Sequence, residues 1–195
     1  MPAPDDIVAH HDPKPGFNPW VRGAAPRETL EIVAYDPTWP ALFEQLAADL
    51  RTALGPIALR IDHIGSSAVP GLAAKPVIDI DLTVADPTAE QRYVPGLAAL
   101  GYDLVIREPH WHQHRCLRLE QPRVNLHVFG PDCPENIRHV LFRDWLRHHA
   151  DDRLRYERAK QAAAIGAHDV MQYNLNKQAV IRDIYARVFA AAGLT

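Results

Sequence analysis

Two aspartates interrupt an otherwise apolar run, residues 77–84, and they constrain the fold more than any other feature of the chain. A short apolar run that follows a proline-containing loop is typical of a buried strand. Asp79 and Asp81 are two residues apart, so on a strand their carboxylates point to the same face. Two like charges in a water-poor environment cost free energy unless something compensates them. The run therefore predicts a central strand with a divalent-cation site, and hard oxygen ligands favour Mg²⁺ or Mn²⁺.

A loop rich in Gly, Ser and Pro, residues 65–76, precedes this strand. Gly65 allows the backbone to approach a ligand closely, and successive N–H groups with the Ser66 hydroxyl can bind phosphate. Ser67 extends this group. Lys75 ends the loop, where it is either a further phosphate contact or a plain surface lysine. A phosphate on the loop and a cation on the strand together suit a nucleoside triphosphate.

The remaining pattern predicts an α/β or α+β domain over residues 27–195, with helices packed on one sheet and a helical C-terminal segment. Apolar residues keep helical spacing before Gly55 and again after Pro134. The expected strands are residues 29–35, 58–64, 77–84, 102–107, 114–119 and 123–129. The expected helices are residues 38–54, 87–100 and 134–192, the last with breaks near 148–152 and 166.

Residues 1–26 are rich in proline and contain few large apolar side chains. Such a segment buries too little surface to offset its ordering entropy, so we expect a flexible arm, with Trp20 and Val21 docking locally. The chain shows neither a secretory signal nor an apolar run long enough to span a bilayer. Cys116 and Cys133 form no CxxC motif, which favours a reducing compartment. We therefore expect a cytoplasmic protein without membrane partners.

Charge argues against a nucleic-acid partner. The formal net charge is −3 and the sequence pI is about 6.4. Non-specific binding of nucleic acid requires a broad basic surface that displaces counterions. The expected ligands are therefore a nucleoside triphosphate and a small acceptor.

Several segments resemble the GrpB family, which is similar to nucleotidyltransferases of the DNA polymerase beta and kanamycin nucleotidyltransferase type. Gly-Ser followed after twelve residues by Asp-Ile-Asp resembles the signature of that superfamily. The narrower match to GrpB lies in residues 35–40, 63–76, 125–128 and 142–147, and the resemblance runs from about residue 28 to 189. It implies a twisted mixed sheet with a metal site at one strand end. It implies no substrate, because the biochemical role of the family is unsettled.

One departure from the superfamily pattern concerns the third carboxylate, which active members generally carry on a neighbouring strand. The corresponding strand here contains Asn125 and His127, which share a face and are not acidic. A neutral His127 can ligate a metal or accept a proton near pH 7, so it is a candidate catalytic and metal-binding residue. The alternatives are a structural histidine or a protein that has lost transfer chemistry.

Other basic residues are weaker candidates. Arg115 and Arg118 are three apart and cannot share a strand face, and we favour Arg115 as a phosphate contact. His110, His112 and His114 alternate and would form a metal site on a strand, although a solvated hairpin is the simpler interpretation. The helical tail offers two pairs at i, i+4 spacing, whose simpler interpretation is solvated helix faces: Arg143 with Arg147 and Tyr173 with Lys177.

Three functions follow from these residues. The first is a Mg²⁺-dependent nucleotidyltransferase that uses Asp79, Asp81 and His127. The second is a non-catalytic sensor of nucleotides or phosphorylated metabolites, motivated by the missing carboxylate. The third is an accessory module linked to coenzyme A metabolism, because some GrpB members are fused to dephospho-coenzyme A kinase. The chain itself has no GxxxxGK[ST] motif.

Overall fold

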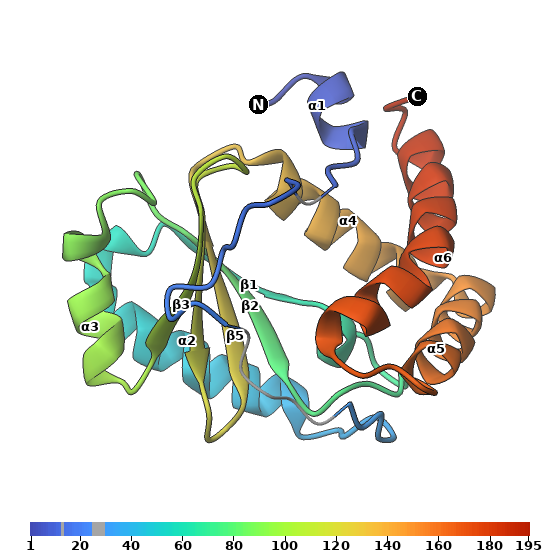
Figure 1. Ribbon diagram of the computed structural model, residues 1–195, viewed down its shortest axis with the longest axis horizontal. Helices are drawn as coiled ribbons and strands as arrows, with labels where there is room; N and C mark the ends of the chain where they lie inside the picture. The colour runs from blue at the N-terminus through green and yellow to red at the C-terminus, as the bar shows by residue number, and fades with distance from the viewer. Residues whose placement is uncertain (13, 25–29) are drawn as a thin grey trace.

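The computed structural model describes residues 1–12, 14–24 and 30–195, which form a five-stranded sheet with helices on both faces (Figure 1). The strands are β1 (Arg60–Ile64), β2 (Ile78–Thr83), β3 (Asp103–Glu108), β4 (His114–Leu119) and β5 (Val124–Phe129). The α-helices are α1 (Pro4–Val8), α2 (Trp39–Leu54), α3 (Val94–Ala99), α4 (Pro134–His148), α5 (Ala150–Ala164) and α6 (Val170–Ala191). Short 3-10 helices span Gly55–Ile57, Ser66–Ala68 and Glu90–Arg92. None of the helices in these residues is long and apolar enough to cross a membrane.

The sheet is mixed, with strand order β1-β2-β5-β4-β3. The central pair, β2 and β5, is parallel, and the other neighbours are antiparallel. The expected mixed α/β fold is therefore confirmed. The expected strand at residues 29–35 is wrong in its described part, because Val33 makes only an isolated bridge with Ala74. Residue 29 lies outside the described residues.

The two faces of the sheet are covered differently. Even-numbered residues of β2 and β5 point to the face covered by α2 and α3, where Ile80, Leu82 and Leu126 are fully buried in the main core. Odd-numbered residues therefore point to the opposite face, on the side of α4, α5 and α6 (Figure 1). Strand parity alone thus separates an apolar core from the face that carries the two aspartates.

The amphipathic helix α2 forms where its apolar spacing predicts it. The Asp36 carboxylate accepts hydrogen bonds from the Thr38 amide and hydroxyl at 2.8 and 2.7 Å, which fixes the turn before the helix. Phe43, Leu46 and Leu50 are buried on one side. The helix ends at Gly55, whose φ of 51° favours glycine.

The N-terminal segment, which the sequence predicts to be a flexible arm, is packed on the domain in its described part. Residues 4–8 form α1, and Ile7 is buried in a second core with residues of α4 and α6. The Arg138 guanidinium of α4 donates to the carbonyls of Ile7 and Ala9 at 2.7 and 2.6 Å. Further along, the Val21 amide donates to the Val105 carbonyl at 3.0 Å. Composition did not predict the contacts of Ile7 and Ala9, whereas the Val21 contact agrees with the local docking expected of Trp20 and Val21. Residues 13, 25 and 26 lie outside the described residues.

Helices α4 and α5 hold the loop that connects β1 to β2. Arg147 donates to the Ala68 carbonyl at 2.9 and 2.8 Å, and Arg143 donates to the His63 carbonyl at 2.9 Å. At the far end of the loop, a Glu157 oxygen accepts from the Ala73 amide at 3.1 Å. The buried Lys160 donates to the carbonyl of the same alanine. The loop is therefore fixed by side chains of the C-terminal helices.

Candidate functional site

Asp79 and Asp81 lie on the sheet face that points toward α4, α5 and α6. In the parallel β2–β5 pair Asp79 is opposite Asn125, and Asp81 is opposite His127. Cross-strand partners share a face, so these four side chains form two adjacent rows. Asp81 is completely buried, whereas Asp79 is partly exposed. The structure thus brings together the three expected catalytic residues, Asp79, Asp81 and His127.

Gly65 lies directly against Asp79. In the antiparallel β1–β2 pair Ile64 is opposite Asp79, and Gly65 begins the loop just beyond that strand. A Cβ atom built on Gly65 would be 2.5 Å from the Asp79 Oδ2 and 3.0 Å from its Cβ. Only a residue without a side chain fits here, and its φ of 70° also favours glycine. The loop that the sequence predicted to bind phosphate and the acidic strand, which the sequence linked only by spacing, are therefore in contact.

His139 of α4 compensates part of the buried charge of Asp81, and sequence reasoning missed this residue. Its Nδ1 is 2.9 Å from the Asp81 Oδ2. Although burial acts in the opposite direction, the Asp81 charge is the main cause that raises the pKa of His139 to about 9. His139 is therefore an imidazolium at neutral pH and forms an ion pair with Asp81. The two residues are 58 positions apart in the chain, so no local pattern indicates the pair.

The oxygen atoms of this site fit a hard cation. Asp81 Oδ1 and Asn125 Oδ1 are buried without a hydrogen-bond partner, while Asn125 Nδ2 donates to the Asp79 Oδ1 at 2.9 Å. Unpartnered buried oxygens are costly, and a cation with its water would satisfy them. Within the described parts of the chain, no three His, Cys, Asp or Glu side chains form a group that could hold a metal ion. The protein thus offers a two-carboxylate arrangement, which suits Mg²⁺ that retains water and phosphate ligands.

His127 belongs to a chain of hydrogen-bonded residues. Its Nδ1 is 3.0 Å from the His114 Nε2, and the His114 Nδ1 is 2.7 Å from the Glu108 Oε2. Burial lowers the pKa of His114 to about 3 and that of His127 to about 4. Both imidazoles are therefore neutral at pH 7, which is the state that can ligate a metal or accept a proton.

A second group, from the loop and from α5 and α6, lies around Asp79. The ammonium groups of Lys75 and Lys177 are 5.5 and 4.5 Å from the centre of the buried Tyr173 ring. Burial lowers the pKa of Lys177 to about 8, and the Asp79 charge opposes that shift. Burial likewise raises the pKa of Tyr156 to about 12, against a hydrogen bond with the Ser66 side chain. The sequence had indicated Ser66 and Lys75 of this group. For Tyr173 and Lys177 it offered only their i, i+4 spacing, which also fits a solvated helix face.

Two of the expected phosphate contacts lie elsewhere. The Ser67 hydroxyl is buried and pairs with the His63 Nε2 at 3.2 Å. Arg115 is opposite Val128, which points into the main core, so its guanidinium lies on the other face of the sheet. There its Nε donates to a Glu90 oxygen at 2.6 Å. The structure therefore brings neither residue to the two aspartates.

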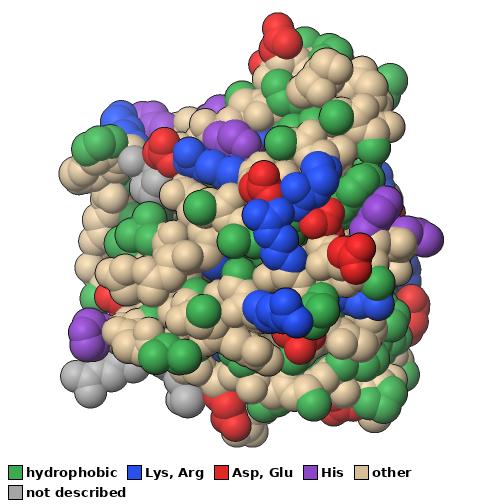
Figure 2. All heavy atoms as spheres, turned by 90° about the vertical axis from the view of Figure 1, so that its right-hand side faces the viewer, with side chains coloured by type: hydrophobic (Ala, Val, Ile, Leu, Met, Phe, Trp, Pro, Cys, Tyr) green, Lys and Arg blue, Asp and Glu red, His purple; other side chains and the backbone are tan. Residues whose placement is uncertain are grey.

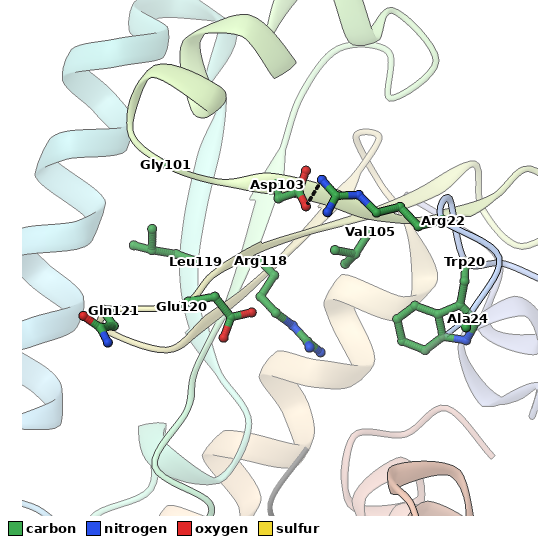
Figure 3. A pocket seen from close by; sticks show the side chains of 10 residues that line it. All are labelled: Trp20, Arg22, Ala24, Gly101, Asp103, Val105, Arg118, Leu119, Glu120 and Gln121. Atoms are coloured by element: carbon green, nitrogen blue, oxygen red, sulfur yellow. Dashed lines mark ion pairs between the residues drawn. The ribbon is translucent and has the colours of Figure 1, made fainter. Parts of the chain in front are cut away.

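Arg118, and not Arg115, lies on the face of the aspartates. It is opposite Asn125 in the β4–β5 pair, which extends the row of Asp79 across the sheet. Arg118 also lines a cavity of about 640 Å³ at the edge of β3 and β4. Figure 3 shows the Arg22–Asp103 ion pair, at 2.6 Å, in one part of this cavity, with Arg118 and Trp20 in another. The alternation of side chains along the strand indicated that only one of the two arginines faces the site, but it did not indicate which arginine.

The alternating histidines do not form a metal site. His112 and Gln113 have φ values of 52° and 54°, so the backbone turns before β4 begins at His114. His110 and His112 lie in this turn, whereas His114 is buried in the sheet. The hairpin interpretation therefore holds for the first two residues, and the third belongs to the chain that ends on His127.

The outer face of α5 and α6 mixes both signs of charge, with Lys and Arg side chains among Asp and Glu (Figure 2). Arg187 illustrates the pairing, because it contacts Asp152 at 2.6 Å and Asp183 at 2.9 Å. Arg155 also pairs with Asp183. The exposed pairs with Asp183 contribute little to stability individually.

These features define a mixed α/β domain in which one sheet face carries a paired-carboxylate site beside a glycine-serine turn. The chain belongs to the GrpB family: the family model described as "GrpB protein" matches residues 29–187. The crystal structure of a conserved GrpB protein from Enterococcus faecalis superposes with a TM-score of 0.74 at 29% identity, covering 83% of this chain and 99% of that one. The family resemblance noted in the sequence is thereby confirmed.

Curated relatives fall into two kinds. A UPF0157 protein of Halalkalibacterium halodurans is 42% identical over 165 residues, covering 83% of this chain and 84% of that protein. A protein named dephospho-CoA kinase from Mycolicibacterium paratuberculosis is 33% identical over 196 aligned residues. That alignment covers 87% of this chain and only 48% of the relative. The match to the second kind is thus confined to about half of a longer protein.

Proposed function

We propose that this protein transfers a nucleotidyl group from a nucleoside triphosphate to a small acceptor, with Mg²⁺ or Mn²⁺ as cofactor. The observation that carries the proposal is the contact between Gly65 and Asp79, with Asp81 on the same face. This contact joins a turn suited to phosphate with a carboxylate pair suited to a hard cation. Neither half alone indicates the reaction.

In the proposed site, Asp79 and Asp81 hold the cation. Held by these two carboxylates, the cation would supply positive charge that stabilises the negative charge developing on the phosphates. Gly65 and Ser66 bind the phosphates through backbone N–H groups and a hydroxyl. Lys75 and Lys177 add ammonium groups from the loop and from α6, where their flanking of Tyr173 supports a joint role.

His127 takes the role that a third carboxylate has in related enzymes. An acceptor hydroxyl attacks the α-phosphorus, a new P–O bond forms, and the bond to pyrophosphate breaks. The hydroxyl proton passes to the neutral His127, whose lowered pKa keeps it unprotonated at pH 7. The support for this role is the position of His127 opposite Asp81.

The test compares two double variants that remove the same charge. The purified protein is incubated with labelled nucleoside triphosphates, Mg²⁺ and pooled small metabolites, and released pyrophosphate is measured. Asp79→Asn with Asp81→Asn should abolish release, whereas Asp132→Asn with Asp151→Asn, at exposed positions, should not. Wild-type release no greater than that of the Asp79 and Asp81 variant would overturn the proposal.

A non-catalytic nucleotide or phosphometabolite sensor is the second candidate. Asn125 stands opposite Asp79 on the strand where a third carboxylate would be expected, and Asp81 already has a cationic partner in His139. Both observations favour ligand binding without turnover. This candidate predicts that nucleotides stabilise the protein in a Mg²⁺-dependent manner while no pyrophosphate is released. Any turnover would eliminate it.

A link to coenzyme A metabolism is a third candidate, supported by the relatives named dephospho-CoA kinase. In this case the domain binds or stabilises an enzyme of that metabolism. Co-purification with such an enzyme should survive Asp79→Asn with Asp81→Asn, because the partnership would not use the carboxylate site. Loss of co-purification in this variant would instead show that the partnership depends on the proposed nucleotide site.

A further inference from the structure

The hydrogen-bonded chain of Glu108, His114 and His127 joins the last residue of β3, the first of β4 and the middle of β5. The distances are 2.7 Å from Glu108 to His114 and 3.0 Å from His114 to His127. His114 is only 3% exposed, and its ring stacks on Phe129 with a centroid distance of 4.7 Å. The middle member is therefore shielded from water and held in one orientation.

The protons of this chain can be placed by elimination. A neutral imidazole carries one N–H. A second proton on either ring is disfavoured because His114 is only 3% exposed and His127 lies within the β4–β5 pair, largely shielded from water. An ionised Glu108 can only accept, so the His114 N–H is at Nδ1 and the His114 Nε2 is an acceptor. The contact between the two rings then requires a donor at the His127 Nδ1. The His127 Nε2 is left with a lone pair.

We infer that Glu108 and His114 are positioning residues that hold His127 as its Nδ1–H tautomer, so that Nε2 is its one free acceptor. In the other tautomer Nε2 would carry a proton and could neither ligate a metal nor accept a proton from a substrate. The role of this nitrogen in catalysis rests on the proposed nucleotidyl transfer. The tautomer itself does not, because it is a property of the ligand-free protein.

The tautomer can be read directly from ring ¹⁵N chemical shifts. Long-range ¹H–¹⁵N correlation spectra of the metal-free, ¹⁵N-labelled protein are recorded at about pH 8, well above the usual carboxyl pKa. The signals of His127 are assigned by their loss in His127→Gln. We expect a protonated Nδ1 and an unprotonated Nε2. An Nε2–H tautomer, or a doubly protonated ring, would overturn the inference.

Two variants of His114 separate positioning from packing. His114→Phe keeps an aromatic ring against Phe129 but removes the acceptor, so His127 should shift toward the Nε2–H form. His114→Gln supplies a side-chain carbonyl that can accept from His127 and should restore the Nδ1–H form. His110→Phe, at an exposed position, is the matched control and should change nothing. An unchanged His127 spectrum in His114→Phe would refute this relay, in which Glu108 and His114 set the tautomer of His127.

Glu108→Ala provides the same test with less disturbance of the core, because the Glu108 side chain is 29% exposed. Without its carboxylate acceptor, His114 is free to exchange tautomers, and the two His127 nitrogen shifts should move toward each other. Unchanged shifts in this variant would also refute the relay. It therefore keeps the inference testable if His114→Phe does not fold.

A kinetic readout links the relay to the proposed function. If pyrophosphate release is found, His114→Phe should lower kcat by roughly 10- to 100-fold with KM little changed, the usual effect of removing a supporting partner. Absence of release with an Nδ1–H tautomer refutes the proposed function and leaves the relay intact. Release with an Nε2–H tautomer refutes the relay alone. The two claims therefore fail separately.

Discussion

Gly65 and Asp79 are in contact across the end of the β1–β2 pair, with the Asp79 Oδ2 only 2.5 Å from the place where a Cβ on residue 65 would stand. The close approach couples a backbone conformation to the position of a carboxylate. A residue with any side chain at position 65 must displace Asp79, the residue that the proposed function places on the cation.

Gly65→Ala should therefore lower both stability and metal-dependent ligand binding. Gly71 is the matched control, since its φ of 78° is equally strained for alanine but nothing lies within 4 Å of its Cβ position. Both variants should lose roughly 1 kcal/mol from backbone strain. Gly65→Ala should lose about 1–3 kcal/mol more from the clash. Urea denaturation measures the difference, and equal losses would contradict the contact.

The Asp81–His139 ion pair predicts a pH dependence. The folded pKa of His139 is about 9 and its ordinary value is 6.5, so the folded state binds the additional proton. The stabilisation is fully present below pH 6.5 and is lost as pH rises through 9. NMR titration of the metal-free protein should find His139 near 9 in the wild type. In Asp81→Asn its pKa should fall markedly, because burial is then opposed only by the charges of Glu135 and Asp79.

The same pair should be visible in the free energy of unfolding, as a difference between wild type and His139→Gln. Lys160 and Lys177, whose pKa values burial lowers to about 7 and 8, stabilise the fold increasingly above those values and oppose His139 in the wild-type curve. Both lysines are present in His139→Gln, so the difference isolates the histidine. It should shrink by roughly 2–3 kcal/mol between pH 6.5 and 9. A constant difference would contradict the ion pair.

Arg115 should be structural. Its guanidinium donates to Glu90 at 2.6 Å and to the Gln113 carbonyl at 2.7 Å, on the face opposite Asp79. Arg115→Met should lower the free energy of unfolding by about 1–3 kcal/mol, as expected for lost hydrogen bonds to a charged group. The thermal shift produced by nucleotide and Mg²⁺ should remain as in the wild type. A weaker shift with unchanged stability would instead make Arg115 a ligand contact.

The docked N-terminal segment predicts a loss of stability in Ile7→Ala. Ile7 is 7% exposed and packs in the second core, so truncation should cost about 1–3 kcal/mol. Val21, which is 40% exposed, is the control, and Val21→Ala should change stability by less than about 0.5 kcal/mol. Chemical denaturation of both variants provides the measurement. A neutral Ile7→Ala would support a mobile arm.

Local pattern predicted much of the fold because its signals are short-range. The alternation in β2 placed Asp79 and Asp81 on one face, and helical spacing indicated α2 and the three helices that follow Pro134. The pairing of the glycine-serine loop with the two aspartates in one site was inferred from a family signature and a general preference of glycine turns for phosphate. Each of these inferences uses residues that are close together in the chain.

Contacts between side chains that are far apart in the chain could not be predicted from the sequence. His139 and Asp81 are 58 positions apart, and Arg138 is 131 positions from Ile7, so no periodicity connects them. The alternation of side chains along β4 indicates only that Arg115 and Arg118 lie on opposite faces of the strand. It does not indicate which arginine lies on the face of the aspartates, and the sequence analysis favoured Arg115. The face of β4 is set by its register with β5, where Arg118 is opposite Asn125.

The hydrogen bonds that fix the β1–β2 loop to α4 and α5 also determine which parts of the molecule respond when a ligand binds. Arg143 and Arg147 of α4 and Glu157 and Lys160 of α5 hold backbone atoms at both ends of this loop. A ligand that tightens the loop must therefore also restrain two helices encoded far downstream. When a ligand binds, amide hydrogen exchange should therefore slow in the loop and also in α4 and α5, so exchange in these two helices measures whether the site is occupied.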